Sequence, residues 1–282
     1  MNESHSTSAI IKSLIDKGFL FTYEIEVGRL NTSGESHFEL IKPLSMPQQD
    51  AYNQILMQMM KKNVVLLHGV TSSGKTEVYI HLIKQALDEH KQVLYLLPEI
   101  ALSAEFLDRV EARFGARPGE WHSGVTRGER RRLWTMAAQH HVGLVVGARS
   151  ALFLPFADLG LIVVDEEHDS SYKQEDGVYY SARDMAVLRA SIGGAQVVLA
   201  SATPSVESYY FAKNGSYSLH ILKNRYGAAK LPEVLMADMN IEQEQGNTTG
   251  FSSVLLEGLE ENLETGRQSI LLLNRRGHNT FV

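Results

Sequence analysis

The segment GVTSSGKT, residues 69–76, constrains the fold of this chain more than any other feature. It fits the pattern G-x-x-x-x-G-K-[ST] and lies between the apolar run Val64–Leu67 and a helical stretch. A strand that ends in a glycine-rich loop at a helix N-terminus directs several backbone N–H groups at one point, where the helix dipole adds about half a positive charge. Phosphate oxygens bind at such a point, so the segment predicts a site for a nucleoside triphosphate.

The residues of this loop have distinct expected roles. Lys75 is expected to reach the β- and γ-phosphates, and the Thr76 hydroxyl is expected to coordinate Mg²⁺. Gly69 and Gly74 allow the backbone to approach the phosphates closely. The predicted ATP-binding residues of the segment are Gly69, Val70, Thr71, Ser72, Ser73, Gly74, Lys75, Thr76 and Glu77.

A second motif, LIVVDEEH, occupies Leu161–His168. Its apolar run predicts a buried parallel strand, and consecutive carboxylates follow at the end where open α/β sheets place their ligands. We expect Asp165 to hold the Mg²⁺ and Glu166 to orient and deprotonate the attacking water, so the predicted catalytic residues are Lys75, Asp165 and Glu166. An acidic run after a strand is often only a solvated loop, but the upstream phosphate-binding loop favours the catalytic interpretation.

Composition limits the class of protein. The 282 residues are 44 % hydrophobic and 21 % charged, which is typical of a globular chain with more than one module. The net charge of −6 means that any contact with nucleic acid must come from local basic patches. The sequence has no cysteine, which excludes disulfides and cysteine-ligated zinc among these residues. No signal peptide or membrane-spanning run is evident, so we predict a cytoplasmic protein without a membrane contact.

The first 45 residues are expected to form a small module. A helical apolar face at Ser8–Lys17 is followed by an alternating segment, a turn at residues 31–34 and a return strand. Helix, strand, turn and strand form the C-terminal part of a winged helix, which makes the helix a candidate for DNA recognition. A helix packed on a hairpin is also common in proteins that do not bind DNA, and the pattern alone leaves both interpretations open.

Residues 46–222 are expected to form the largest module. A helix is predicted at Gln48–Lys62, after a linker with a proline on either side. The predicted strands that follow are Val64–Leu67, Val93–Leu97, Val142–Val146, Leu161–Val164 and Gln196–Leu199. Helical segments separate these strands, so the predicted fold class is α/β with a parallel sheet and flanking helices.

The C-terminal residues 223–282 are expected to begin another module. Less regular strands are predicted near Tyr217–Leu222 and Glu233–Met239. A polar loop around Gln245–Gly250, a helix that ends near Gly266 and a strand at Ile270–Leu273 are predicted beyond them.

Seven short motifs follow one another along the chain: GVTSSGKT, LLPEIALS, WHSG, VGARSALFLPF, DEEH, SATPS and LLLNRRG. Their order closely resembles that of the primosomal protein N′ family of replication-restart DNA helicases, in helicase superfamily 2. The resemblance spans nearly the whole chain, and its most specific parts are Val146–Phe156, Asp165–Ala190 and Leu271–Gly277. It implies the end of a winged-helix domain at residues 1–45, a RecA-like ATP-binding helicase domain at 46–222 and the start of a second RecA-like domain at 223–282.

The resemblance also implies binding residues outside the phosphate-binding loop. Gln48 is similar to the glutamine that reads adenine, because an amide can both donate to and accept from the adenine edge. The alternative is an ordinary glutamine at the exposed start of a helix. Three loops, two of which follow predicted strands, are similar to those that hold a single-stranded DNA backbone. The implied DNA-binding residues of these loops are Pro98, Glu99, Ser123, Gly124, Arg149 and Ser150.

The segment Asp169–Arg183 is similar to the aromatic-rich loop of the family. Aromatic rings stack on bases and cations pair with phosphates, so this loop can sense single-stranded DNA and report it to Glu166; a solvated loop with packing tyrosines is the alternative. The implied DNA-binding residues here are Tyr172, Lys173, Tyr179, Tyr180 and Arg183. The implied coupling residues are His168, Ser201 and Thr203, although a threonine after a strand is often only a helix cap.

The function that the resemblance implies is an ATP-dependent 3′-to-5′ DNA helicase that restarts stalled or collapsed replication forks. Its implied cofactors are ATP and Mg²⁺, and its implied partners are single-stranded and forked DNA, primosome proteins and single-strand-binding proteins, close to the nucleoid. Longer members continue into a cysteine-rich zinc-binding insertion and a second motor half, so zinc is expected only there and this chain is expected to be an internal or truncated fragment with poor turnover. The alternatives are another superfamily 2 DNA translocase and a nucleotide-responsive DNA-binding module without turnover.

Overall fold

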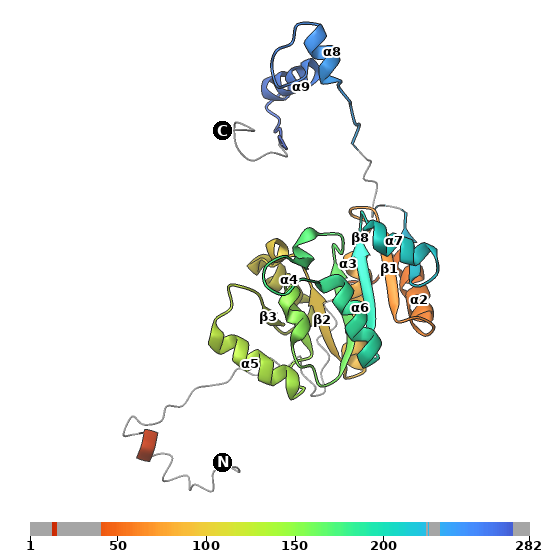
Figure 1. Cartoon of the computed structure of the whole chain (residues 1–282), viewed down its shortest axis with the longest axis vertical. Coiled ribbons are helices and arrows are strands. Elements are labelled where there is room, and N and C mark those ends of the chain that lie inside the picture. The colour runs from red at the N-terminus through yellow and green to blue at the C-terminus, as the bar shows by residue number, and fades with distance from the viewer. Residues whose placement is uncertain (1–12, 16–40, 224, 226–231, 273–282) are drawn as a thin grey trace. The chain divides into compact units, whose positions relative to one another are not determined.

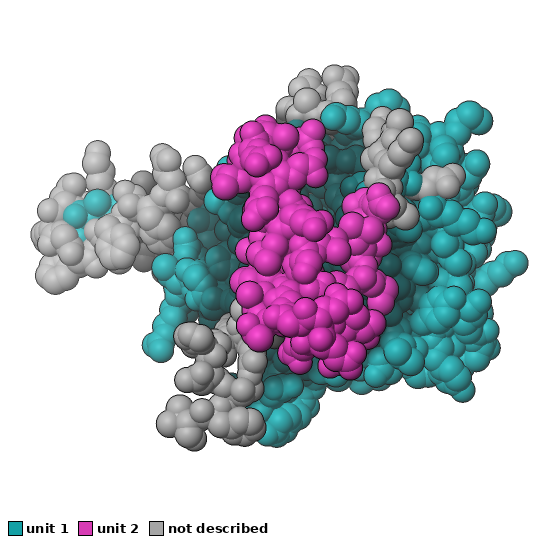
Figure 2. Space-filling view, turned by 90° about the horizontal axis from the view of Figure 1, so that it is seen from above, with its two compact units in different colours: residues 1–228 teal, residues 229–282 magenta. Residues whose placement is uncertain are grey.

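The computed structural model (Figure 1) describes residues 13–15, 41–223, 225 and 232–272. The chain divides into two compact units, residues 1–228 and residues 229–282 (Figure 2). The predicted helix at Ser8–Lys17 and the hairpin after it lie outside the described residues, apart from a helical turn at 13–15. Among the described residues, no helix combines the length and the apolar character that crossing a membrane requires.

Unit 1 is built on a seven-stranded sheet. Its strands are β1 (Val64–Gly69), β2 (Gln92–Leu96), β3 (Gly119–Trp121), β4 (Leu144–Gly147), β5 (Leu159–Asp165), β8 (Gln196–Ser201) and β9 (Ser218–Leu222). They lie in the order β3-β4-β2-β5-β8-β1-β9, and every neighbouring pair is parallel. The predicted α/β fold with a parallel sheet is therefore confirmed, with small shifts at the ends of the strands.

The central strands are apolar along their length because helices cover both faces of the sheet. Val65 and Leu67 of β1 pack into one core, whereas Val64 and Leu66 pack into the other. The first core also receives α2 (Met46–Met59), α3 (Lys75–Asp88) and α4 (Ala104–Phe114). The second receives α5 (Arg127–Ala138), α6 (Ala182–Gly193) and α7 (Val206–Lys213).

Several short elements were not anticipated from the sequence. The edge strand β3 has the sequence Gly-Glu-Trp, which shows no apolar run. A two-stranded hairpin is formed by β6 (Lys173–Gln174) and β7 (Tyr180–Ser181). Three 3₁₀ turns follow strands, namely η2 (Glu99–Ala101), η3 (Arg149–Phe153) and η4 (Ser170–Tyr172). The predicted helix at Gln48–Lys62 begins instead at Met46, because Ser45 is its N-cap and Gln48 completes a capping box.

Unit 2 contains α8 (Met239–Glu244) and α9 (Ser253–Glu264), and α9 confirms the predicted helix that ends near Gly266. The predicted strand at Glu233–Met239 is wrong, because residues 233–238 form no strand and Asp238 caps α8. The described residues 270–272 of the strand predicted at Ile270–Leu273 are not a strand either. An extended segment becomes a strand only when a neighbour satisfies its backbone groups, and neither segment has such a neighbour among the described residues.

The carboxyl ends of the parallel strands form one edge of the sheet, and the strand order divides this edge in two. The loops after β1, β5 and β8 lie together and, with the residues that flank them, are called here the P-loop half, residues 70–76, 165–169 and 202–205. The loops after β2, β3 and β4 are called the distal half, residues 97–103, 122–126 and 148–153. Open α/β sheets bind ligands at this edge, so both halves are candidate binding regions.

Candidate nucleotide-binding and catalytic site

The loop after β1 is closed by tight packing around two glycines. Gly74 has a left-handed φ of +83° and precedes α3 directly. A Cβ atom there would lie 2.0 Å from Nε2 of Gln48, and a Cβ atom on Gly69 would lie 2.5 Å from Oγ of Ser73. A side chain at Gly69 would displace neighbouring side chains, and one at Gly74 would also be strained by the left-handed backbone, so both positions favour glycine.

Lys75 is buried inside this loop, where its Nζ donates to the carbonyl oxygen of Gly69 at 2.8 Å. Burial lowers the pKa of Lys75, and the charges of Glu166 and Asp165 offset part of this effect. The buried Oγ of Ser73 has no hydrogen-bond partner among the described residues. The loop therefore holds a poorly solvated cation, which suits an anionic ligand.

A cavity of about 500 Å³ opens beside the loop. It is lined by Lys42, Pro43, Gln48, Thr71, Ser72, Gly74, Lys75, Thr76, Glu77, Asp165 and Glu166. The two predicted motifs, which are far apart in the sequence, thus meet in one cavity of the size that small-molecule sites have. Of the predicted loop residues, Gly69, Val70 and Ser73 do not line it, and Glu77 forms a two-bond ion pair with Arg113 at 2.6 and 2.7 Å.

Asp165, the last residue of β5, is held by two buried tyrosines. The Tyr79 hydroxyl donates to Oδ2 of Asp165, and the Tyr95 hydroxyl lies 3.1 Å from the same oxygen. The Tyr79 hydroxyl also lies 3.0 Å from Oγ of Thr76. Burial, followed by nearby negative charge that includes Asp165, raises the pKa of both tyrosines well above the usual value, so both remain protonated donors. Sequence analysis missed these two residues because each fits the apolar pattern of its element.

Asp165 and Thr76 have the chemistry that Mg²⁺ selects. Mg²⁺ is usually bound by one or two protein oxygens together with substrate phosphates and water, and less often by a cage of protein ligands. Among the described residues, no group of three or more His, Cys, Asp or Glu side chains could hold a metal ion alone. The carboxylate and the hydroxyl line the same cavity, which suits a metal shared with a phosphate ligand.

Glu166 has a left-handed φ of +46°, which is unusual for a residue with a side chain. Its backbone N–H donates to Oδ1 of Asp165 at 3.0 Å, and its side chain lines the cavity. His168 Nδ1 lies 3.6 Å from Oε2 of Glu166 and 2.8 Å from Oγ of Ser201. The backbone N–H of Thr203 donates to the same Ser201 oxygen at 2.9 Å. The predicted coupling residues therefore form one chain of contacts that ends at Glu166.

Glu167 differs from its two acidic neighbours, because it is only 2 % exposed and does not line the cavity. Its carboxylate accepts from the Ser205 backbone N–H at 2.7 Å and from the Ser208 hydroxyl at 2.9 Å, and lies 3.4 Å from Nη1 of Arg183. These donors compensate the cost of burying a charge. Glu167 braces the loop after β5 against the loop after β8, a role that the sequence did not reveal.

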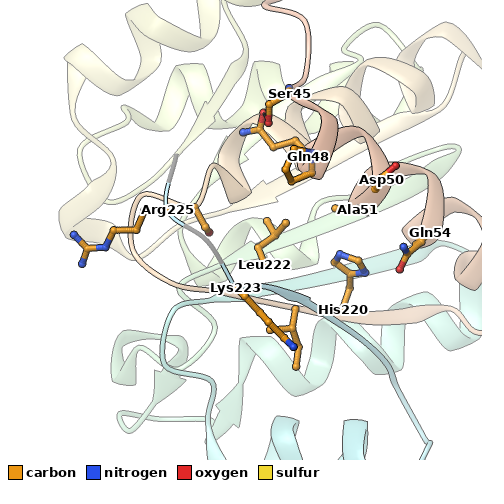
Figure 3. A pocket seen from close by; sticks show the side chains of 12 residues that line it. Ser45, Gln48, Asp50, Ala51, Gln54, His220, Leu222, Lys223 and Arg225 are labelled. Atoms are coloured by element: carbon orange, nitrogen blue, oxygen red, sulfur yellow. Dashed lines mark hydrogen bonds between the residues drawn. The ribbon is translucent and has the colours of Figure 1, made fainter. Parts of the chain in front are cut away.

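Gln48 lies between the cavity and a second one of about 540 Å³, which is bounded by α2 and the end of β9 (Figure 3). Oε1 of Gln48 accepts from the backbone N–H and the hydroxyl of Ser45, at 2.9 and 2.8 Å. Its Nε2 is 3.5 Å from the carbonyl oxygen of Gly74. The amide oxygen is thus used to cap α2, and the amide nitrogen is the end that is least engaged.

The distal half gathers the loop residues that were predicted to contact DNA. Oε1 of Glu99 accepts from the backbone N–H of Ser123 at 3.3 Å, and Nε1 of Trp121 donates to Oγ of Ser150 at 3.1 Å. The structure thus brings together the loops after β2, β3 and β4. The exposed members are Glu99, Ser123, Gly124 and Ser150, whereas Pro98 is buried and Arg149 is half-buried.

The hairpin β6–β7 projects from the segment that follows the carboxylates. Tyr179 near its tip is 77 % exposed, and Lys173 is also exposed. The ring of Tyr180 packs against Phe153, with 5.1 Å between the ring centres. Nη1 of Arg149 donates to the carbonyl oxygens of Ser171 and Lys173, at 3.0 and 2.9 Å, and so fastens the base of the hairpin to the distal half.

Two of the predicted DNA contacts need correction. Tyr172 is only 2 % exposed, and its hydroxyl donates to the carbonyl oxygen of Asp165 at 2.6 Å. Arg183 is buried and its guanidinium is used by Glu167 and Ser205. Neither side chain presents a free ring or charge to a strand of nucleic acid in this structure, because both are used to hold the loops around Asp165 and Glu167.

The comparison with protein families gives one match. The DEAD/DEAH box helicase family matches residues 45–210 of the chain. This span begins at the cap of α2, contains both motifs of the cavity and ends within α7.

Individual relatives match over more of the chain. The replication restart protein PriA of Bacillus subtilis (strain 168) is 42 % identical over 284 residues, which cover 99 % of this chain and 35 % of the relative. PriA of Rickettsia felis is 43 % identical over 250 residues, which cover 84 % of this chain and 38 % of the relative. The chain thus spans little more than a third of the length of these relatives. Among solved structures, RecG bound to a three-way DNA junction is 20 % identical with a TM-score of 0.49, and the match covers 68 % of this chain and 26 % of that chain.

Proposed function

Since this chain belongs to the DEAD/DEAH box helicase family and is similar to the PriA replication restart proteins over nearly its whole length, we propose that it is the ATP-binding motor part of a replication-restart DNA helicase. The observation that carries this proposal is the single cavity in which Lys75 and Thr76 face Asp165 and Glu166. Hydrolysis of a nucleoside triphosphate needs these groups together: a cation for the phosphates, oxygen ligands for the metal and a base for water.

Each side chain then has a specific task. Lys75 would leave the Gly69 carbonyl and pair with the phosphates. Asp165 and Thr76 would hold Mg²⁺, which neutralises the charge that develops on the phosphates. Tyr79 keeps Oδ2 of Asp165 occupied and so fixes the direction of the carboxylate. Glu166 would accept the proton of the attacking water.

The contact chain from Glu166 through His168 to Ser201 supports a coupling role. A shift of Glu166 toward bound nucleotide would change the position of the loop after β8, because Ser201 also accepts a hydrogen bond from the Thr203 N–H. We propose that this chain transmits the nucleotide state to the surface that binds DNA.

The same cavity supports slow turnover by the 282-residue chain. Among its described lining residues the cations are Lys42 and Lys75, and none is an arginine. An arginine finger contributes on the order of 10³–10⁵ in rate to reactions of this class. We therefore propose that efficient hydrolysis requires an arginine from outside the described residues.

The finer assignments follow from the relatives. The relatives are named replication restart proteins, and we propose single-stranded and forked DNA as substrates and action at stalled forks in the cytoplasm. Unwinding in the 3′-to-5′ direction, contacts with primosome and single-strand-binding proteins, and a zinc site in other parts of the longer proteins are part of the same proposal.

Two measurements test this function. Calorimetry with a non-hydrolysable ATP analogue should show binding to the 282-residue chain that weakens when EDTA removes Mg²⁺. The ATPase rate of the complete protein should rise on addition of oligo(dT), while that of the 282-residue chain should stay low. Binding without any dependence on Mg²⁺ would exclude the metal site at Asp165. If DNA did not change the ATPase rate of the complete protein, the protein would be a nucleotide-binding module and not a DNA motor.

A further inference from the structure

One face of α5 combines exposed arginines with an exposed tryptophan. Arg127, Arg131 and Trp134 are spaced i, i+4 and i+7, so they lie on one side of the helix. Leu133 and Ala137 point the other way, into the second core. All three residues of the outer side are exposed, and Trp134 is 46 % exposed. We call Arg127, Arg131 and Trp134 the α5 face.

The charge on this face is not neutralised by the protein. Carboxylates or carbonyl oxygens engage most of the other arginines described in unit 1, namely Arg113, Arg117, Arg130, Arg149, Arg183 and Arg189. By contrast, the side chains of Arg127 and Arg131 make no hydrogen bond or ion pair with any described residue. The first turn of α5 contains one acid, Glu129, whose carboxylate is used to cap the helix at Thr126. A chain with a net charge of −6 thus carries a local positive patch here.

The α5 face is continuous with the distal half. The ring centres of Trp134 and Trp121 are 6.4 Å apart, and Nε1 of Trp121 donates to Ser150 in the loop after β4. Arg130 lies between the helix and the loop after β3: its guanidinium is 5.7 Å from the centre of the Trp121 ring, and its Nη2 donates to the Ser123 carbonyl at 3.1 Å. A ligand that crosses the loops after β3 and β4 would therefore meet the α5 face next.

We propose that the α5 face binds single-stranded DNA and extends the strand path beyond the loops of the distal half. Arg127 and Arg131 pair with phosphates, and the indole of Trp134 stacks on a base. This inference rests on the proposed function and adds a contact surface to it.

A single strand uses both kinds of side chain on this face. Its bases are free to stack, whereas those of a duplex are already stacked on one another. An acidic protein segment could pair with the two arginines but would leave the exposed indole without a matching partner. The combination of uncompensated charge and an exposed aromatic ring therefore favours the single strand.

The tryptophans provide a direct measurement, because the chain has two and both are in this region. In a Trp121→Phe variant of the 282-residue chain, Trp134 is the sole tryptophan. Titration of this variant with oligo(dT) at low salt should quench its fluorescence at the concentration at which the strand binds. Mg-ATP alone, which we place at the P-loop half, should leave the fluorescence unchanged.

Substitutions separate charge from stacking. Arg127→Gln combined with Arg131→Gln should weaken oligo(dT) binding roughly tenfold and reduce the slope of log K against log salt by about 1.4, since each phosphate contact with a single strand contributes about 0.7. Trp134→Ala should weaken binding on the order of tenfold and leave the slope unchanged. The matched control is Arg109→Gln on α4, a helix that covers the opposite face of the sheet, which should change the affinity less than about twofold.

The outcomes distinguish this inference from the proposed function. If the chain binds oligo(dT) but Trp134 fluorescence stays constant and the α5 variants bind like the wild type, the inference is wrong and the proposed function stands. If the double arginine variant no longer binds a polyglutamate peptide that the wild type binds, and its affinity for oligo(dT) is unchanged, the face binds an acidic protein and the inference is equally wrong. If the wild-type chain does not bind oligo(dT) at low salt, the proposed DNA function fails too. Unchanged nucleotide affinity in each variant verifies that it is folded.

Discussion

The two halves of the carboxyl edge differ in how deeply their polar side chains are buried. In the P-loop half, Lys75, Asp165 and Glu167 are bound by other groups of the protein, and Lys75 and Glu167 are buried. In the distal half, Ser123 and Ser150 are exposed, and Ile100 is 94 % exposed. Polar groups of the first half are thus held in place by the protein, whereas the second half presents exposed side chains.

The difference matches the ligands proposed for the two halves. Stabilising the charge of a phosphoryl group requires dipoles and charges fixed in a site with little water, where electrostatic interactions are strong. A motor that moves along DNA must bind the strand and release it at each step, so contacts made in water, which are individually weaker, are better suited. Under the proposed function, the burial of polar groups would distinguish the part of the edge that catalyses hydrolysis from the part that binds the moving strand.

Contacts made by Tyr172 and Arg149 connect the two halves. The hydroxyl of Tyr172 donates to the Asp165 carbonyl and lies 3.1 Å from the Leu96 carbonyl at the end of β2. Arg149 of the distal half donates to carbonyls at the base of the hairpin. These contacts are the places where a strand bound on one side can influence the carboxylates on the other.

The largest expected effect is on catalysis in the P-loop half. Glu166→Gln in the complete protein should lower the ATPase rate by about 10²–10⁴ and leave nucleotide affinity unchanged, because the amide cannot accept the proton of water. Asp165→Asn should instead weaken Mg²⁺ binding, which a metal titration can measure. A normal rate in Glu166→Gln would mean that another group is the base. Glu167 is not a candidate, because it is buried away from the cavity.

The next effect concerns the stability of the same half. Glu167→Ala should destabilise unit 1 by about 3–5 kcal/mol, because it leaves the Ser205 N–H and the Ser208 hydroxyl without their acceptor, at about 1–3 kcal/mol each, and removes one of the partners of Arg183. Urea denaturation measures this change. The matched control is Glu207→Ala, since Glu207 is exposed and 4.0 Å from the same guanidinium, and it should cost below about 1 kcal/mol. An equal decrease in the free energy of unfolding in both variants would show that the buried carboxylate does not stabilise the two loops.

A smaller effect is expected on ligand affinity. Lys75→Ala should weaken binding of Mg-ATP by about 1.5–3 kcal/mol, the worth of a charge-assisted contact to phosphate. Lys61→Ala provides the control, because Lys61 is exposed and does not line the cavity. Calorimetry on the two variants decides the matter, and equal affinities would remove Lys75 from the phosphate site.

The smallest effect belongs to the distal half and depends on pH. The hydrogen bond from Ser123 lowers the pKa of Glu99. A carboxyl with a lowered pKa stabilises the folded form above its unfolded pKa, and this contribution disappears as the pH falls through the lower folded value. Because Glu99 is exposed, the effect should be below about 0.5 kcal/mol. Hydrogen exchange of the Ser123 amide should accelerate at acid pH in the wild type and be fast at every pH in Glu99→Ala, which has no side-chain acceptor, after correction for intrinsic rates. An unchanged protection in that variant would contradict the contact.

Local sequence patterns predicted the sheet and the two motifs. A phosphate-binding loop and a strand followed by carboxylates are each specified by a few consecutive residues. The brace around Glu167 was not predictable, since it joins the loop after β5 to Arg183, Ser205 and Ser208 through packing. Nor could residue type alone separate exposed Tyr179 from buried Tyr172, because both have the same chemistry and differ only in what covers them. The prediction of strands in unit 2 was wrong for a related reason, because strand formation depends on a neighbouring strand elsewhere in the sequence.

The left-handed backbone at Glu166 has a consequence for how this protein can evolve. A residue with a side chain in that conformation costs on the order of 1–3 kcal/mol, whereas glycine adopts it freely. Glu166→Gly should therefore yield a chain that folds as well as the wild type or better, yet lacks a base. Selection for a more robust fold and selection for catalysis pull this position in opposite directions. A glutamate retained here would be a record of past selection for activity.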